Sequence, residues 1–293
     1  MINDLLIYVT GSRGLIGRQI CKTLTSKGIQ VVTDESLVGR RLNLETEKLL
    51  DFLSMEVSHI VHCAAVIPNQ KDAEDNESLQ LRNYAIDMNV YEASSTKKIP
   101  VIYMSGCGLY DRQSGEVQTE DSALLPRTPY FMSKLIGERL FCEDGKSTVV
   151  RVSAPFGPGM AKAVVLQRFL DQAISGSPIS LWGSGHREQD YISVEDIAIA
   201  VQRIVVMKKH GIFNIAAGKP TTMYEMAKTI SKRFGGEVVF VGKSDPNDFE
   251  RVRISIERAQ IELNWSPQLS LSRWIDEDFL NDDQASAVEG RTP

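Results

Sequence analysis

The chain opens with a strand pattern that runs directly into a glycine-rich turn. Residues 5–10 are mostly β-forming, and Gly11, Gly14 and Gly17 follow at regular spacing before a helical pattern that extends to residue 27. The first glycine permits a tight turn, the second lets a pyrophosphate approach the backbone, and the third lets the helix pack on its strand. The free N–H groups at the helix start attract phosphate. The turn therefore predicts a dinucleotide-binding strand–turn–helix unit.

A second strand pattern over 29–33 ends at Asp34. An acidic residue about 20 positions beyond the glycines is placed to bind the adenosine ribose hydroxyls. Because such a carboxylate repels a 2′-phosphate, Asp34 favours NAD over NADP. Arg13, Arg40 and Arg41 supply positive charge nearby, so NADP stays possible as the coenzyme.

The overall composition excludes several other classes of protein. Of the 293 residues, 42% are hydrophobic and 24% charged, and the net charge of −5 gives no electrostatic basis for binding nucleic acid or an anionic membrane. No apolar run approaches the ~20 residues of a membrane span, and the N-terminus lacks a cleavable signal pattern, so we expect a cytoplasmic protein. The four cysteines and four histidines show no metal-ligand spacing, and we expect no metal.

Strand and helix patterns alternate through the first half of the chain. Further strands are predicted over 59–63, 100–105 and 147–152, and helices over 45–55, 76–97 and 129–144. This alternation predicts an α/β fold with a Rossmann-type, doubly wound parallel sheet that is covered by helices on both faces. The segment between Asp34 and Asn43 leaves room only for a brief third strand.

The second half is less regular and suggests a smaller, mixed α/β substrate domain. Helices are predicted over 161–175, 193–208 and 222–234, and strands over 212–216 and 237–241. The expected division is a Rossmann domain over 1–155 with a returning segment of about 187–215, a substrate domain over 156–186 and 216–281, and a flexible tail over 282–293.

Tyr130 and Lys134 form a Tyr-x-x-x-Lys pair within a helical pattern. Residues four apart share one helix face, so the phenol and the ammonium point into the same site. A nearby ammonium favours the phenolate, which suits the tyrosine to exchange a proton with a substrate oxygen while hydride moves at the same carbon. The remaining donors of Lys134 suit the nicotinamide ribose.

With these motifs the sequence resembles the extended short-chain dehydrogenases/reductases of the NAD-dependent epimerase/dehydratase family, which modify nucleotide-activated sugars. The likeness extends to about Trp274. It rests on residues 10–17, 34, 62–65, 83, 89–90, 103–105, 109–110, 130, 134, 151, 157–159, 182–185, 190–198, 213–218 and 263–267.

The resemblance implies a bound NAD or NADP, a nucleotide sugar held between two domains, and a homodimer formed through the helices near 76–97 and 129–144. It implies Tyr130, Lys134 and Ser105 as catalytic residues. Together with the glycine turn, it places these residues at the coenzyme: Gly11, Arg13, Gly14, Leu15, Ile16, Gly17, Asp34, Asn43, Leu44, Ala64, Ala65, Asn83, Ser105, Tyr130 and Lys134.

One departure from the family lies beside the catalytic pair. Counting back from Tyr110, the position that usually carries a Ser or Thr hydroxyl is Gly106, with Ser105 before it and Cys107 after it. Ser105 is expected to point to the other face of its strand. Loss of this hydroxyl weakens proton transfer by about 10²-fold or more.

Two further departures concern substrate binding. Ala154 stands where an Asn usually holds the sugar or diphosphate, and Gln189 where an Arg meets the nucleotide phosphates. Arg187 and Arg251 are candidates to supply the missing charge. The substrate site is therefore expected to include Gly106, Cys107, Ala154, Arg187, Gln189 and Arg251.

Three functions remain open at this point. The first is an epimerase or oxidoreductase that acts on a nucleotide sugar through Tyr-assisted hydride transfer. The second is a reductase of 4-keto-deoxysugar nucleotides that uses NADPH, which the modest length and the short segment after Asp34 favour. The third is a non-catalytic NAD(P)-binding sensor or scaffold, which the loss of the hydroxyl at Gly106 suggests.

Overall fold

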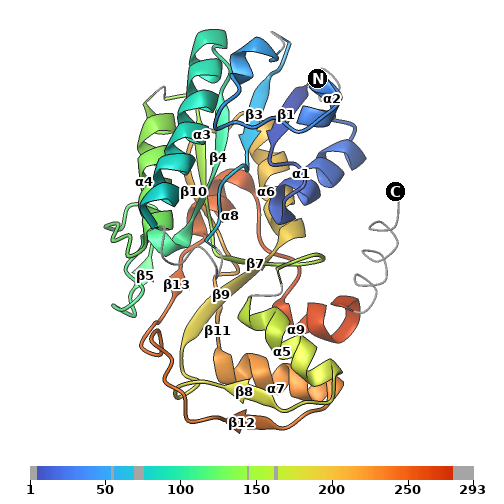
Figure 1. Cartoon of the computed structure of the whole chain (residues 1–293), viewed down its shortest axis with the longest axis vertical. Helices are drawn as coiled ribbons and strands as arrows, with labels where there is room; N and C mark the ends of the chain where they lie inside the picture. Colours follow the sequence, from blue (N-terminus) through green and yellow to red (C-terminus); the bar gives the residue numbers. More distant parts are fainter. Residues whose placement is uncertain (1–4, 54–55, 69–75, 144, 162–163, 280–293) are drawn as a thin grey trace.

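The computed structural model describes residues 5–53, 56–68, 76–143, 145–161 and 164–279. Two lobes are visible in Figure 1: a larger one built around a parallel sheet, and below it a smaller one formed mainly by the second half of the chain. The predicted tail over 282–293 lies outside the described residues. The division of the chain into domains remains a prediction.

The larger lobe contains a six-stranded sheet in which every neighbouring pair is parallel. From one edge to the other, the strands are β2 (Gln30–Val32), β1 (Leu6–Thr10), β3 (His59–His62), β4 (Val101–Gly106), β6 (Thr148–Val152) and β10 (Gly211–Ile215). The chain passes from β1 to β2 on one side and returns to β3 on the other. Such a switch point opens a crevice at the carboxyl ends of the strands. The structure confirms the predicted Rossmann-type sheet.

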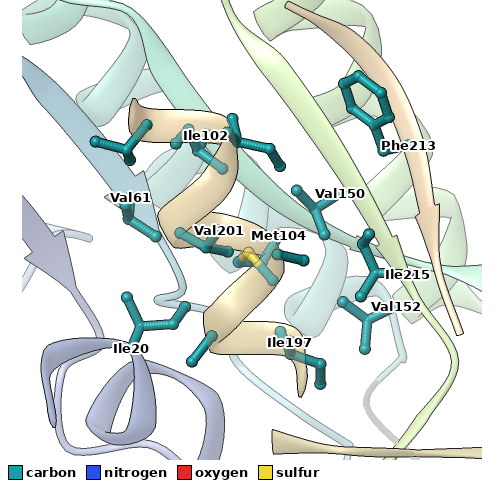
Figure 2. Close-up of a cluster of buried hydrophobic side chains, with 14 of the residues drawn as sticks. Ile20, Val61, Ile102, Met104, Val150, Val152, Ile197, Val201, Phe213 and Ile215 are labelled. Carbon is teal, nitrogen blue, oxygen red and sulfur yellow. The ribbon is translucent and has the colours of Figure 1, made fainter. Parts of the chain in front are cut away.

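Helices cover both faces of this sheet (Figure 1). One face packs against α1 (Leu15–Ser26), α6 (Val194–Met207) and α8 (Glu257–Leu263), and the other against α3 (Asn76–Lys97) and α4 (Pro129–Cys142). Figure 2 shows Ile197 and Val201 of α6 against Met104 and Val150 of the sheet. Within the described ranges, no helix combines the length and apolar character that crossing a membrane requires.

The smaller lobe has its own hydrophobic core, in which Phe156, Phe169 and Trp274 are buried. Its helices are α5 (Val165–Ile174), α7 (Met223–Phe234) and the short α9 (Leu271–Arg273), which continues as a π-helical turn (Trp274–Asp278). Its sheets pair β7 (Ala154–Phe156), β9 (Glu188–Ser193) and β11 (Pro220–Thr222), and separately β8 (Ile179–Leu181) and β12 (Val238–Phe240). A last pair joins β5 (Val117–Gln118) to β13 (Arg253–Ile254).

The C-terminal third of the chain does not stay within the smaller lobe. Helix α8 packs against α6, and Ala259 and Leu263 belong to the core of the large sheet. The indole N–H of Trp265 donates to the backbone oxygen of Asp196, with 3.0 Å between the two atoms. This return of the chain ties the two lobes together.

Two local predictions between β2 and β3 are wrong. In place of a brief third strand the chain forms helix α2 (Asp34–Val38), because Thr33 and Ser36 make a capping box and Gly39 ends the helix with a φ of 71°. The predicted helix over 45–55 is reduced to a 3₁₀ turn (Leu49–Asp51). There the side chain of Asn43 accepts from the N–H of Glu45, and such side-chain bonds compete with the helical ladder.

Candidate active site

The glycine turn leads from β1 into α1 and leaves no space for side chains. Gly11 has a φ of 62°, and a Cβ there would lie 2.7 Å from the backbone nitrogen of Ala64. A Cβ on Gly17 would lie 2.3 Å from the backbone oxygen of Gly11. Gly14 is the N-cap of α1 and offers no side chain to the first N–H groups of the helix, whose first turn contains no acidic residue. The turn therefore exposes N–H donors in the way that a phosphate requires.

A cavity of about 480 Å³ lies at this switch point of the sheet. It is lined by Gly11, Asp34, Arg41, Leu42, Asn43, Leu44, Glu45, Ala64, Ala65, Val66, Arg82 and Ile86. Six of the residues predicted at the coenzyme are therefore brought together here, from α2 and the segments that follow β1, α2 and β3. Arg13 is instead largely exposed, and its guanidinium lies 3.6 Å from the carboxylate of Glu35.

Asp34 faces this cavity, but its carboxylate also has partners within the protein. The Tyr8 hydroxyl donates to one oxygen at 2.5 Å, and the N–H of Leu42 donates to the other at 3.3 Å. Burial, and then this hydrogen bond and charge, raise the pKa of Tyr8 far above its usual range. Each carboxylate oxygen keeps further lone pairs, so the role of Asp34 at a ribose stays a prediction.

Asn83 on α3 fixes one wall of the cavity. Its side-chain oxygen accepts from the N–H of Val66 at 2.7 Å, and its amide donates to the Val66 oxygen at 3.1 Å. The same amide donates to the hydroxyl of Ser133 on α4 at 3.2 Å. Asn83 therefore links the cavity wall to the helix that carries Tyr130.

A second cavity, of about 290 Å³, lies beside Tyr130. It is lined by Ile16, Ile67, Ser105, Gly106, Cys107, Gly108, Arg112, Tyr130, Phe131, Val152, Ser153, Ala154, Pro155, Gln189 and Val252. Ile16 belongs to the first turn of α1, directly after the glycine turn. The cavity therefore extends from the glycine turn to Tyr130 and on to β7 and β9 of the smaller lobe.

Tyr130 and Lys134 lie on the same side of α4, as their spacing predicts. Thr128 caps the start of this helix by accepting from the N–H of Phe131. The Lys134 ammonium is buried, 4.7 Å from the ring centre of Tyr103 and 5.9 Å from that of Tyr130. The phenol of Tyr130 makes no hydrogen bond with any residue in the described part of the chain, so its proton is available to a ligand in the cavity.

Comparison with known proteins identifies the family of the chain. Residues 7–216 match the model of the NAD-dependent epimerase/dehydratase family. The chain belongs to this family. It is 28% identical over 304 aligned positions to a dTDP-4-dehydro-6-deoxyglucose reductase of Escherichia coli, with 92% of this chain and 95% of that protein covered. It is 25% identical to a putative UDP-glucose 4-epimerase of Methanocaldococcus jannaschii, over 92% of this chain and 96% of that protein.

A solved structure shares the fold of this chain. The UDP-glucuronic acid 4-epimerase of Bacillus cereus, determined with UDP-glucuronic acid and NAD, superposes with a TM-score of 0.84 at 20% identity, over 96% of this chain and 100% of that one. The coenzyme of this epimerase/dehydratase family is NAD. The first cavity fits this coenzyme, because Gly11 and Gly17 cannot carry a Cβ and the start of α1 is free of side-chain caps.

The hydroxyl that the family usually places at Gly106 has no substitute in the second cavity. Ser105 donates its proton to the Glu138 carboxylate at 2.5 Å, on the α4 side of β4. The Cys107 thiol donates to the backbone oxygen of Arg151 at 3.3 Å. Burial raises the pKa of this thiol well above its usual value. Ser105 and Cys107 both line the cavity, yet neither directs its proton into it, and the catalytic role predicted for Ser105 stays a prediction.

An arginine absent from the sequence-based prediction stands beside Gln189. Arg112 donates to the Gln189 side chain at 2.6 Å, and it lies 3.0 Å from a carboxylate oxygen of Glu250. Arg187 contacts the same carboxylate at 3.1 Å and lies outside the walls of the cavity. Two guanidinium groups therefore meet at one acid at the edge of the cavity. Arg251 instead donates to backbone oxygens of its own loop.

Sequence reasoning missed three residues of this site: Arg112, Phe131 and Glu138. Glu138 lies four residues after Lys134 and is buried with Arg151, whose guanidinium contacts its carboxylate at 2.7 Å. The helical spacing from Lys134 is the signal that could have identified Glu138 as a residue on the face of the catalytic pair. No spacing signal identified Arg112, because its partner Gln189 lies 77 residues away.

Proposed function

We propose that the protein is an NAD(P)-dependent oxidoreductase or epimerase that acts on a nucleotide-activated sugar, with Tyr130 as its proton-transfer group. The main support for this proposal is that Ile16 and Tyr130 line the same cavity. Ile16 lies between Gly14 and Gly17 of the turn that fits the coenzyme. The Tyr130 phenol has no hydrogen-bond partner among the residues that the structure describes. The same cavity therefore lies beside the coenzyme-binding turn and beside the phenol of Tyr130.

The chain's own residues supply binding, orientation and proton transfer. When bound, NAD supplies the redox chemistry by taking a hydride from a sugar carbon or giving one to it. The phenol of Tyr130 exchanges a proton with the oxygen on that carbon. The Lys134 ammonium lies beside the rings of Tyr130 and Tyr103, where its charge stabilises the negative charge that develops on the phenol oxygen during proton transfer.

Reduction of a 4-keto-deoxysugar nucleotide is the second candidate. The reductase from Escherichia coli that covers 92% of this chain favours it. In such a reaction Tyr130 gives its proton to the carbonyl oxygen and recovers one from solvent. Epimerisation instead needs the same phenol to remove and return one proton without net loss of coenzyme.

A panel of UDP-, GDP-, CDP- and dTDP-sugars, each incubated with NAD(H) and NADP(H), tests the proposal. Consumption of reduced coenzyme at 340 nm together with a new sugar nucleotide identifies a reductase. A new epimer without net coenzyme change identifies an epimerase. Coenzyme binding without any turnover across the panel would contradict the proposal and favour the non-catalytic sensor.

We also propose that the protein acts in the cytoplasm as a homodimer that pairs through α3 and α4. The support is a set of exposed apolar side chains on these two helices, namely Leu81, Tyr84 and Met132. Sedimentation equilibrium at micromolar concentration is expected to give twice the chain mass of 32.6 kDa. A single-chain mass at that concentration contradicts the dimer.

A further inference from the structure

The aromatic ring of Phe131 fills the space that side chains at positions 106 and 108 would occupy. A Cβ on Gly106 would lie 2.9 Å from Phe131 Cε1, and a Cβ on Gly108 would lie 2.0 Å from Phe131 Cζ. Real Cβ atoms do not approach other carbons this closely, because interiors are already close-packed. Neither glycine has a positive φ, so it is the ring and not the backbone conformation that excludes a side chain there.

This ring stands directly beside the proton-transfer group. Phe131 follows Tyr130 in the chain, and the two rings meet edge to face with 5.2 Å between their centres. Both side chains line the second cavity. A sugar carbon that brings its oxygen to the Tyr130 phenol therefore brings neighbouring carbons to the face or edge of Phe131.

The wall around Phe131 offers few hydrogen-bond partners. Ser153 lines the same cavity, but its hydroxyl donates to Asp190 at 2.6 Å. The protons of Ser105 and Cys107 are likewise bound to acceptors within the protein. Val152, Ala154 and Pro155 add only apolar side chains. Arg112 and Gln189 are polar, and Arg112 donates to the side-chain oxygen of Gln189.

We propose that Phe131, with Gly106 and Gly108, is a specificity-determining residue that selects nucleotide sugars with a deoxygenated carbon next to the reacting one. A hydroxyl placed against the Phe131 ring loses its bonds to water and gains no hydrogen bond from the ring, whereas a methyl or methylene group packs on it. This inference rests on the proposed function and narrows its substrate class.

The test uses matched nucleotide sugars in which one hydroxyl is replaced by hydrogen. The parent hexose and its 2-, 3- and 6-deoxy derivatives are compared on the nucleotide that the panel above selects, with NAD(H) present. The derivative that lacks the hydroxyl on the carbon next to the reacting one is expected to exceed the parent by about 10- to 100-fold in kcat/KM, the range that an apolar pocket achieves. A parent hexose that is used as well as this derivative overturns the inference and leaves the proposed function intact.

Variants of Phe131 test whether this side chain produces the preference for the deoxy sugar. Phe131→Ala is expected to reduce the preference to about threefold or less, while Phe131→Leu retains most of it because the wall stays apolar. Phe52→Ala is the matched control, since Phe52 is exposed and lies outside the cavity wall. The cap of α4 survives each change, because Phe131 contributes only its backbone N–H to Thr128. An unchanged preference in Phe131→Ala overturns the assignment.

A reciprocal variant restores the hydroxyl that the site lacks. Gly106→Ser alone is expected to lower turnover of the deoxy sugar, because its Cβ displaces the ring. Phe131→Ala combined with Gly106→Ser provides space for the serine, and its preference is expected to reverse toward the hydroxylated parent. Thermal unfolding of each variant separates loss of the fold from loss of selectivity. If no nucleotide sugar binds to the wild-type protein or reacts with it, the proposed function is overturned, and this inference is overturned with it.

Discussion

At the scale of single residues, Gly17 places the strictest limit on the coenzyme turn. Its missing side chain is what lets α1 begin against the Gly11 carbonyl. Gly17 lies within α1, where alanine is otherwise the better helix former by about 1 kcal/mol. If Gly17 is replaced by alanine, the steric conflict therefore lowers the stability of the fold, whereas the helix propensity raises it.

We predict that Gly17→Ala lowers the free energy of unfolding by about 1–3 kcal/mol, because overpacking outweighs the gain in helix propensity. The affinity for NAD is expected to fall at least about tenfold, since the phosphate-binding turn must open. Chemical denaturation and NAD titration measure the two effects.

Gly176→Ala is the matched control for this change. Gly176 has a φ of 73° and nothing within 4 Å of its Cβ position, so the substitution costs only backbone strain of about 1 kcal/mol. NAD affinity is expected to be unchanged in this control. Equal NAD affinity in Gly17→Ala and the wild type would show that the turn does not hold the coenzyme.

The sequence predicted the parts of the site that depend on residues close together in the chain. It missed the parts that depend on contacts between residues far apart in the chain. The spacing of Tyr130 and Lys134 predicted their common helix face, and the position of Ser105 predicted that its hydroxyl points to the other face of β4. The hydrogen bond from Tyr8 to Asp34 joins β1 to the start of α2 and was not expected. The fit of Phe131 over Gly106 depends on how α4 packs against β4, and spacing carries no information about that.

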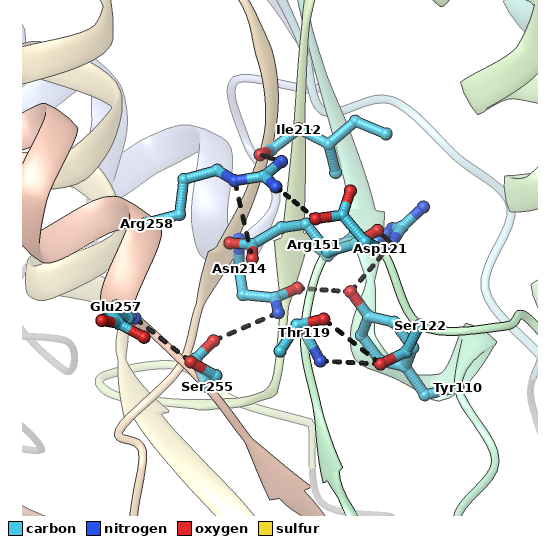
Figure 3. A network of polar contacts seen from close by, with 11 residues as sticks. Tyr110, Thr119, Asp121, Ser122, Arg151, Ile212, Asn214, Ser255, Glu257 and Arg258 are labelled. Carbon is cyan, nitrogen blue, oxygen red and sulfur yellow. Dashed lines mark hydrogen bonds and ion pairs between the residues drawn. The ribbon is translucent and has the colours of Figure 1, made fainter.

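At the scale of elements, α4 is anchored to the sheet by a buried ion pair. The side chains of Glu138 and Arg151 are 4% and 3% exposed. Burial lowers the pKa of Arg151, but the hydrogen bonds and charge of Glu138 outweigh it and raise the pKa above its usual range. Arg151 also donates to Tyr110, and Figure 3 shows this hydroxyl joined in turn to Asn214 of β10.

We predict that Glu138→Gln lowers the free energy of unfolding by about 3–5 kcal/mol, because it leaves the Arg151 guanidinium buried without a counter-charge. Urea denaturation measures this effect. Glu143→Gln, an exposed site at the end of the same helix, is the control and is expected to change stability by less than about 0.5 kcal/mol. A loss in Glu138→Gln as small as that of the control contradicts the anchoring role.

The elements themselves were predictable where hydrophobic patterns were long. The strands of the large sheet and the helices α1, α3 and α4 were predicted from the alternation of apolar strand runs with helical stretches. The segment between β2 and β3 was not predictable in this way, because Asn43, Glu47 and Arg40 form local side-chain bonds that replace the helical ladder. The short strands β5 and β13 escaped prediction, since each is two residues long and is defined by its partner.

At the scale of the whole molecule, stability depends on a histidine at the far end of the sheet. Burial, and then the positive charges of His210 and Lys208, lower the pKa of His59 to about 4. In the unfolded chain a histidine titrates near 6.5. Between these two values the unfolded chain binds a proton that the folded protein does not bind, so the free energy of unfolding falls as pH falls.

We predict a loss of about 1–2 kcal/mol between pH 7 and pH 5 from His59 alone. Denaturation of the wild type and of His59→Leu at both pH values isolates this contribution, because the variant lacks the titrating group. Glu47, whose pKa is about 2, titrates below this window and does not interfere. The same pH dependence in both proteins would contradict the assignment to His59.

The most direct test of the account is the rate of Tyr130→Phe with a substrate that the wild type converts. Turnover is expected to fall by about 10²–10⁴-fold, because the phenol is the group that exchanges the proton. The dissociation constant for NAD, measured in the same preparation, is expected to stay at its wild-type value, because Tyr130 does not line the first cavity. A Tyr130→Phe variant that converts the substrate at the wild-type rate contradicts the central claim.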